Sequence, residues 1–88
     1  MRPRRPAWEV VDLPPVARQR TNAPPALAAY LTAITDLFEQ DPALVTAAFR
    51  VQRVGADLVL HFPNGRGFLR YRVVAPVATV YLVELCWP

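Results

Sequence analysis

DLVLHFPNGRGFLRYRVV, residues 57–74, is the stretch that decides the fold, because it predicts two strands joined by a tight turn. Asn64 and Gly65 lie at its centre, and this dipeptide suits a two-residue type I′ hairpin, in which both central residues need positive φ. A loop of that length fixes the antiparallel register of the two flanking strands, Asp57–Phe62 and Gly67–Val74.

The predicted register sorts the side chains of the hairpin into two faces, since successive side chains alternate along a strand. One set is a core face: Leu58, Leu60, Phe62, Leu69 and Tyr71. The other set is polar and partly aromatic: Asp57, Val59, His61, Phe68, Arg70 and Arg72. A weaker turn at Gly55-Ala56 extends this polar face to Arg50 and Gln52, with Arg66 at its rim. We expect a helix to cover the first face and to leave the second uncovered.

The main helix is predicted from Pro24-Pro25 to about Gln40, because Pro42 disfavours helical geometry at the residue before it. Thr21 or Asn22 is expected to help cap its start. Apolar side chains recur in this segment at helical spacing: Leu27, Leu31, Ile34 and Leu37 or Phe38. A short second helix can run from Asp41-Pro42 through Ala48.

The remaining elements are strands and connections. Residues 1–6 form a basic tail, Ala7–Leu13 a first strand ended by Pro14-Pro15, and residues 16–23 a loop or short helix. After the helices the apolar period becomes two, which predicts four strands: Phe49–Val54, Asp57–Phe62, Gly67–Val74 and Ala78–Trp87. The last of these is apolar on both faces, so we expect it inside the sheet.

The predicted fold class is therefore α+β, in one small domain over residues 7–88. It has an N-terminal strand, one main helix with a short second helix as an option, and an antiparallel meander of about four strands. The helix is expected to lie on one face of the sheet.

Composition limits the kind of protein. The chain is 53% apolar and 19% charged, which is typical of a globular domain and not of a disordered one. It has no apolar run long enough to span a membrane, and no apolar segment follows the basic start. We therefore expect a soluble cytoplasmic protein, with neither secretion nor membrane insertion.

The net charge of +3 comes with ten arginines and no lysine or serine. Arginine favours bidentate contact with phosphate or carboxylate, so the bias fits an anionic partner. For the polar face the sequence leaves three interpretations open. The first is a solvated face on which Asp57 pairs with Arg72. The second is a phosphate-binding surface on which Phe68 or His61 stacks on a base, and the third is a surface that binds an acidic protein.

Site chemistry is sparse. Phosphate-loop and hydrolase-elbow motifs are absent, and without serine there is no serine nucleophile. His61 and Cys86 are the single histidine and cysteine, 25 positions apart, so we expect no metal site, no cofactor and no internal disulfide. Cys86 is predicted to be a small apolar filler, with a reactive role as the alternative. Tyr71 and Tyr81 are predicted to be core tyrosines with rim hydroxyls, and Glu84 to pair with an arginine or lie at a less buried point.

Three segments together resemble one protein family. LTAITDLFEQDP (31–42), GRGFLRYRVV (65–74) and ATVYLVEL (78–85) are similar to the corresponding parts of the RelE/ParE toxin superfamily of bacterial toxin–antitoxin modules. In that family a helix ends in a comparable acidic-proline stretch, a strand rich in arginine and tyrosine follows, and an apolar strand closes the domain. The resemblance covers roughly residues 8–86.

The resemblance implies a toxin that is neutralised by a cognate antitoxin. RelE-like members are metal-independent endoribonucleases that cut messenger RNA on the ribosome, whereas ParE-like members inhibit DNA gyrase. The residues that it implies for catalysis are Arg70, Arg72, Tyr81 and His61, and those for RNA binding are Arg50, Arg66, Phe68, Arg70 and Arg72.

The sequence departs from the nuclease pattern in two respects: it has no lysine, and VYLVELCWP ends without a basic or Tyr/His tail. The alternative interpretation is a non-enzymatic protein–protein interaction module, for example a homodimer formed through the apolar last strand.

Overall fold

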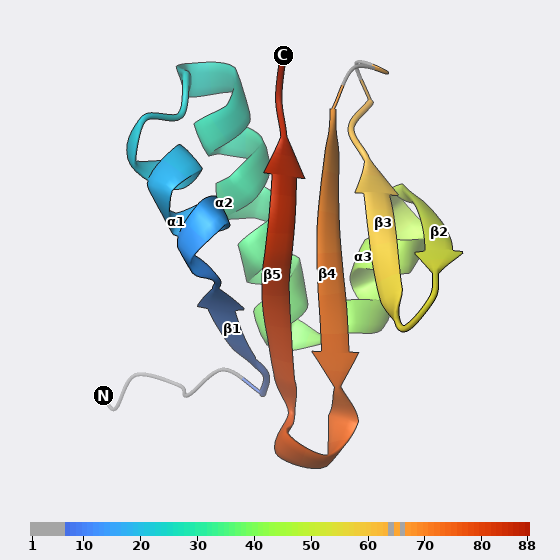
Figure 1. Cartoon of the computed structure of the whole chain (residues 1–88). Coiled ribbons are helices and arrows are strands. Elements are labelled where there is room, and N and C mark those ends of the chain that lie inside the picture. The colour runs from blue at the N-terminus through green and yellow to red at the C-terminus, as the bar shows by residue number, and fades with distance from the viewer. Residues whose placement is uncertain (1–6, 64, 66) are drawn as a thin grey trace, which may run out of the picture.

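The computed structural model describes residues 7–63, 65 and 67–88. The predicted tail, Asn64 of the predicted turn and Arg66 lie outside the described residues. The elements follow in the order β1 (Glu9–Asp12), α1 (Pro14–Thr21), α2 (Pro25–Gln40), α3 (Pro42–Ala48), β2 (Arg50–Val54), β3 (Asp57–His61), β4 (Phe68–Val74), a 3₁₀ turn (Ala75–Val77) and β5 (Thr79–Cys86). The strands form one sheet in the order β1-β5-β4-β3-β2, and the helices pack against one of its faces (Figure 1). The predicted α+β fold class is confirmed.

The main helix, α2, buries the predicted apolar stripe against the sheet: Leu27, Leu31, Ile34 and Phe38. Asp41 ends α2 and caps α3, where its side-chain oxygen accepts a hydrogen bond of 2.9 Å from the Ala43 backbone N–H. The optional second helix is therefore confirmed. Within the described residues, no helix is both long and apolar enough to cross a membrane.

The start of α2 differs from the prediction. Thr21 and Asn22 lie at the end of α1, and the residue before α2 is Pro24, with no side-chain cap. The expected cap is wrong because Pro14 and Pro15 begin a helix of their own. Proline at the first helical positions loses only an N–H group that would have no partner there.

Both predicted hairpins form in the predicted register. In the first, Leu60 lies opposite Leu69 and His61 opposite Phe68; in the second, Arg50 lies opposite His61. Gly55 and Gly65 have φ of 63° and 72°, the left-handed values that these turns require.

The first strand completes the sheet in a way that was not predicted. β1 pairs in parallel with β5, from Glu9 opposite Thr79 to Asp12 opposite Leu82, so the sheet is mixed and β5 is interior along this stretch. Beyond the end of β1, the Gln19 side-chain amide donates a hydrogen bond of 2.7 Å to the Leu85 carbonyl oxygen. A side chain of α1 thus replaces the missing strand at this edge of β5.

A β-bulge interrupts the pairing of β4 with β5. Arg70 lies opposite Glu84 and Tyr71 opposite Leu82, which leaves Val83 as the extra residue of β5. Leu82 and Leu85 are both buried, so the face presented by β5 changes at this point. The bulge turns Val83 and Glu84 together toward the side of the sheet that the helices do not cover.

Candidate functional site

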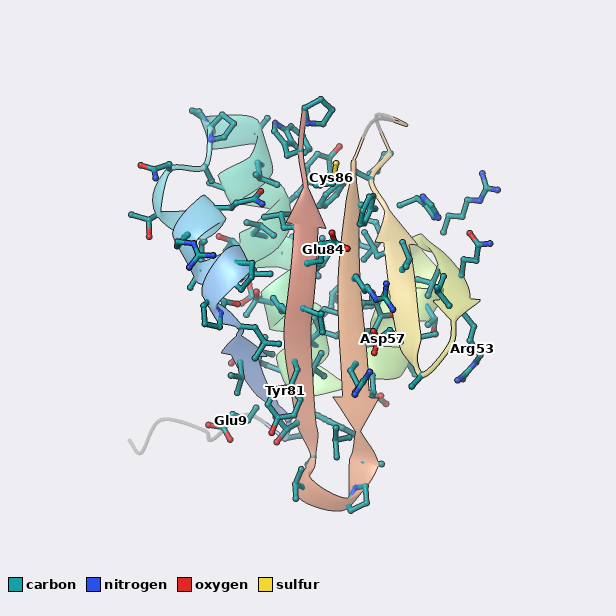
Figure 2. All side chains as sticks on the ribbon, in the orientation of Figure 1. Glu9, Arg53, Asp57, Tyr81, Glu84 and Cys86 are labelled. Carbon is teal, nitrogen blue, oxygen red and sulfur yellow. The ribbon has the colours of Figure 1, made fainter. Side chains whose placement is uncertain are left out.

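The face of the sheet opposite the helices, called here the uncovered face, carries the predicted polar set. The registers place Arg50, Gln52, Asp57, Val59, His61, Phe68, Arg70 and Arg72 on it. β5 adds Tyr81, Glu84 and Cys86, and β1 adds Glu9; all four are labelled in Figure 2. The predicted segregation of the hairpin into an apolar and a polar face is confirmed.

A three-residue cluster lies at the middle of this face. Nε of Arg70 donates to one oxygen of Asp57 at 2.7 Å, and Nε of Arg72 donates to the other at 2.6 Å. Asp57 is only 3% exposed. The hydrogen bonds from Arg72 and then from Arg70 hold the pKa of this carboxyl below its usual value. The predicted pairing of Asp57 with Arg72 is therefore confirmed, and Arg70 shares the same carboxylate.

The two guanidinium groups are held by one nitrogen each. Within the described ranges, these Nε contacts are the hydrogen bonds that Arg70 and Arg72 make with other side chains. Their side chains remain 35% and 52% exposed. The cluster therefore orients the arginines and leaves their terminal nitrogens available for an anion.

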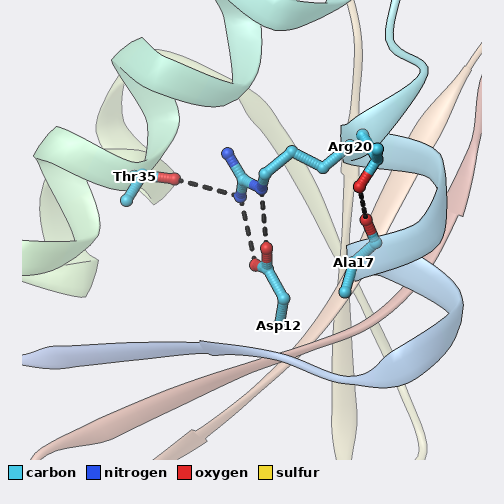
Figure 3. Close-up of polar contacts among 5 residues, drawn as sticks. Asp12, Ala17, Arg20 and Thr35 are labelled. Atoms are coloured by element: carbon cyan, nitrogen blue, oxygen red, sulfur yellow. Dashed lines mark hydrogen bonds and ion pairs between the residues drawn. The ribbon is translucent and has the colours of Figure 1, made fainter.

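A second arginine–carboxylate pair lies on the helix side and differs in how it is used. Arg20 of α1 contacts both oxygens of Asp12 in β1, from Nε at 2.6 Å and from a terminal nitrogen at 3.1 Å. The same terminal nitrogen lies 3.4 Å from the Thr35 hydroxyl of α2 (Figure 3). This guanidinium therefore connects β1, α1 and α2, and it serves the fold.

Tyr81 and Arg72 lie opposite each other on β5 and β4 and line one pocket of the uncovered face. The pocket is an open depression of about 310 Å³, and its other walls are the aliphatic side chains of Leu13, Val74 and Val83. Tyr81 is half-buried. A guanidinium that can bind a phosphate and a phenol that can transfer a proton thus meet at one place.

His61 lies at the other end of the face. It belongs to a pocket of about 400 Å³ that it shares with Arg50 and Phe49, and its ring nitrogen is 3.4 Å from the Gln52 side-chain oxygen. Its partner Phe68 and Arg72 are four positions apart on β4, a distance of roughly 13 Å along a strand. The structure therefore brings Arg72 and Tyr81 together, with Arg70 joined to Arg72 through Asp57, and it places His61 away from Arg72 and Tyr81.

The charges of the uncovered face are balanced. Its charged members in the described part of the chain are three arginines and three carboxylates: Arg50, Arg70, Arg72, Glu9, Asp57 and Glu84. Glu84 is exposed and lies opposite Arg70. This confirms the prediction that it lies at a less buried point of the strand. The sequence reasoning missed that Glu9 shares this face, because that follows only from the parallel pairing of β1 with β5.

Comparison with solved structures finds a similar fold. No protein-family model matches the sequence, and no curated protein matches it. The fold is similar to a chain in the crystal structure of the toxin–antitoxin complex RelBE2 from Mycobacterium tuberculosis, with a TM-score of 0.67 and 19% sequence identity. The match covers 92% of this chain and 98% of that one. The chain has a RelE-like fold. The resemblance stated from the sequence is thus confirmed at the level of the fold.

Within the RelE-like fold the two tyrosines differ from their predicted positions. Tyr71 is a core residue as predicted, but its hydroxyl is not at the rim, because the residue is fully buried and the hydroxyl has no hydrogen-bond partner. Burial raises the pKa of Tyr71 to about 12. Tyr81 lies on the uncovered face and not in the core. The sequence hid this because β5 is apolar along both faces.

Cys86 also departs from its predicted role. It is exposed on the uncovered face opposite Phe68, so it does not fill the core. In the described ranges, no group of three or more His, Cys, Asp or Glu side chains is arranged to hold a metal ion.

Proposed function

We propose that this chain is the toxin of a cytoplasmic toxin–antitoxin pair and cleaves messenger RNA on the ribosome without a metal ion. The observation that carries the proposal is the position of Arg72 and Tyr81, opposite each other on the uncovered face, with Arg70 held beside them by Asp57. The RelE-like fold supplies the context.

In the proposed reaction the 2′-hydroxyl of RNA attacks the adjacent phosphorus and the 5′-oxygen leaves, which gives a 2′,3′-cyclic phosphate. The terminal nitrogens of Arg70 and Arg72 bind the non-bridging oxygens and stabilise the charge that develops on them. Arginine stays protonated and is a poor base, so Tyr81 acts as the general acid: its phenol donates a proton to the leaving 5′-oxygen, the proton of the attacking 2′-hydroxyl passes to solvent water, and the phenolate is then reprotonated from solvent.

The other predicted RNA-binding residues would act away from the cleaved bond. Phe68 and Arg50 lie toward the His61 end of the face, where an aromatic ring can stack on a base and a guanidinium can bind a further phosphate. His61 is assigned to this part of the path, because its distance from Tyr81 separates it from the reacting phosphate. Arg66 stays a predicted contact at the rim.

The proposal is tested by tightly controlled expression in a bacterial host, followed by pulse-labelling of new protein. We expect the wild-type chain to stop translation within minutes, and both the Arg70→Ala/Arg72→Ala double variant and Tyr81→Phe to lose most of this effect. Arg53→Ala is the matched control, because Arg53 is an exposed arginine of edge strand β2 outside the cluster. An arginine-independent effect, or none, would overturn the proposal.

The balanced charge of the uncovered face favours a second candidate, a protein target of the gyrase type that is bound and not cleaved. RNA binding draws most of its affinity from phosphate contacts, whereas a face of alternating charges can pair with a protein surface. In the same experiment, growth arrest while protein synthesis continues would select this candidate. If neither occurs, a non-enzymatic interaction module remains, and a monomer over a wide concentration range would exclude the homodimer form of it.

A further inference from the structure

We infer that the pocket beside Arg72 and Tyr81 is a binding site for a single nucleobase, the one next to the phosphate that the arginines bind. The inference rests on the proposed function, in that it takes RNA as the ligand. It adds a recognition site to a surface that was otherwise assigned only to phosphate binding and proton transfer.

The walls of the pocket suit a flat aromatic ring. Leu13, Val74 and Val83 contribute aliphatic surface, and Tyr81 contributes an aromatic ring. Bases stack favourably on aromatic side chains, and aliphatic groups pack against their faces. The volume of about 310 Å³ is at the lower end of the range for small-molecule sites, so it suits one base better than a larger ligand.

Three separate parts of the chain build this pocket, which makes it a specific feature of the fold. Val83 reaches it because the bulge in β5 turns this extra residue onto the uncovered face. Leu13 reaches it because β1 lies parallel to β5, and the Leu13 backbone N–H donates a hydrogen bond of 3.0 Å to the Leu82 carbonyl oxygen. Val74 is at the end of β4, just before the 3₁₀ turn.

The polar groups of the pocket identify the class of ligand. Arg72 is the charged group in its lining, and Asp57 holds its Nε, so the terminal nitrogens are directed by an anchored side chain. A planar ring joined to an anion fits this combination of aliphatic wall, aromatic ring and guanidinium. A nucleotide has that composition, and the Tyr81 hydroxyl can form a hydrogen bond to the edge of its base.

The test uses the wild-type chain with methyl-labelled leucine and valine, titrated with each of the four nucleoside monophosphates and with ribose 5-phosphate. We expect the nucleotides to shift the methyl signals of Leu13, Val74 and Val83 and to bind about fivefold or more tightly than ribose 5-phosphate, because only they carry a base. Equal affinities, or nucleotide binding that leaves these methyl groups unchanged, would overturn the inference.

A filling substitution gives a second measurement. Val83→Phe should remove the preference for nucleotides over ribose 5-phosphate while ribose 5-phosphate binding is retained. The control Leu44→Phe, at an exposed position of α3 on the other side of the sheet, should leave both unchanged. Should Val83→Phe not fold, the comparison of the two ligands on the wild-type chain still decides the question.

The outcomes also separate this inference from the proposed function. If nucleotides bind in the pocket but expression does not stop translation, the base site stands and the ribonuclease proposal fails. If translation stops in an arginine-dependent way but nucleotides bind no better than ribose 5-phosphate, the ribonuclease proposal stands and the base site fails.

Discussion

The protein has two clusters in which arginine donates hydrogen bonds to aspartate, and the two clusters differ in how many nitrogens of each guanidinium are bound. At Asp12, one guanidinium spans both carboxylate oxygens and reaches Thr35. At Asp57, one carboxylate receives a single nitrogen from each of two arginines. The first arrangement occupies its guanidinium within the fold, and the second holds two guanidinium groups in place with their outer nitrogens available. Both clusters contain ion pairs, so an ion pair alone does not distinguish a structural arginine from a candidate functional arginine. The two kinds differ in how many guanidinium nitrogens are bound within the protein.

The largest expected effect is on activity, where substitutions in the two clusters should differ. Arg72→Ala is expected to lower the rate of messenger RNA cleavage by roughly 100-fold or more, as loss of a group that stabilises developing charge does. Arg20→Ala should leave the rate per folded molecule unchanged. The measurement is cleavage of a defined message in a purified translation system at equal concentrations of folded protein, and equal losses in both variants would contradict the distinction.

Loss of the helix-side pair should lower the stability of the protein and not its activity. Arg20→Ala removes the contacts that join β1, α1 and α2, and it should lower the free energy of unfolding by about 1–2 kcal/mol, since the pair is only partly shielded from water. Urea unfolding measures this loss, with Arg53→Ala as the control, expected to change stability by less than about 0.5 kcal/mol. A loss no larger than that of the control would mean that the pair does not stabilise the fold.

A pH series isolates the contribution of the second cluster. Because the two arginines hold the folded-state pKa of Asp57 below the ordinary aspartate value of 3.8, its stabilising contribution is fully present well above that pH. It is lost as the pH falls from there through the folded-state pKa. Asp57→Asn should therefore be less stable than wild type at pH 7, and the difference should narrow below pH 3.8. A difference that stays constant down to pH 3 would show that the carboxylate charge is not what stabilises the cluster.

The smallest effect concerns a polar group with no partner. The buried Tyr71 hydroxyl makes no hydrogen bond, so Tyr71→Phe should leave the free energy of unfolding unchanged or raise it by up to about 1 kcal/mol. An ultraviolet titration of the wild-type chain should show one tyrosine ionising at about pH 12, and this step should be absent in Tyr71→Phe. A marked loss of stability would mean that the hydroxyl has a partner, such as a bound water molecule.

The sequence was most informative where structure is set by neighbours in the chain. Two short turns fixed the pairing of β2, β3 and β4, so the positions of Arg50, His61, Arg70 and Arg72 on one face followed from counting residues. The helix α2 followed equally well from its apolar spacing, because burial of one stripe dominates its energetics.

The rest depended on contacts between distant segments. The parallel pairing of β1 with β5 joins residues 70 positions apart, such as Val11 and Tyr81, and no local pattern specifies it. The bulge at Val83 cannot be recognised in a strand that is apolar on both faces, so the direction of Tyr81 was also hidden. The Arg20 contact with Asp12 needed both the α1 helix and the position of β1.

The pairing of β1 with β5 has a consequence for the order in which the protein folds. The pocket takes Leu13 from one end of the chain and Tyr81 from the other, and closing so long a loop is slow compared with forming the two local hairpins. The helices and the β2–β4 hairpins need no contact between the two distant strands, so the Asp57 cluster can form before β1 and β5 pair. The pocket beside it is therefore completed last, when Leu13 reaches Val83.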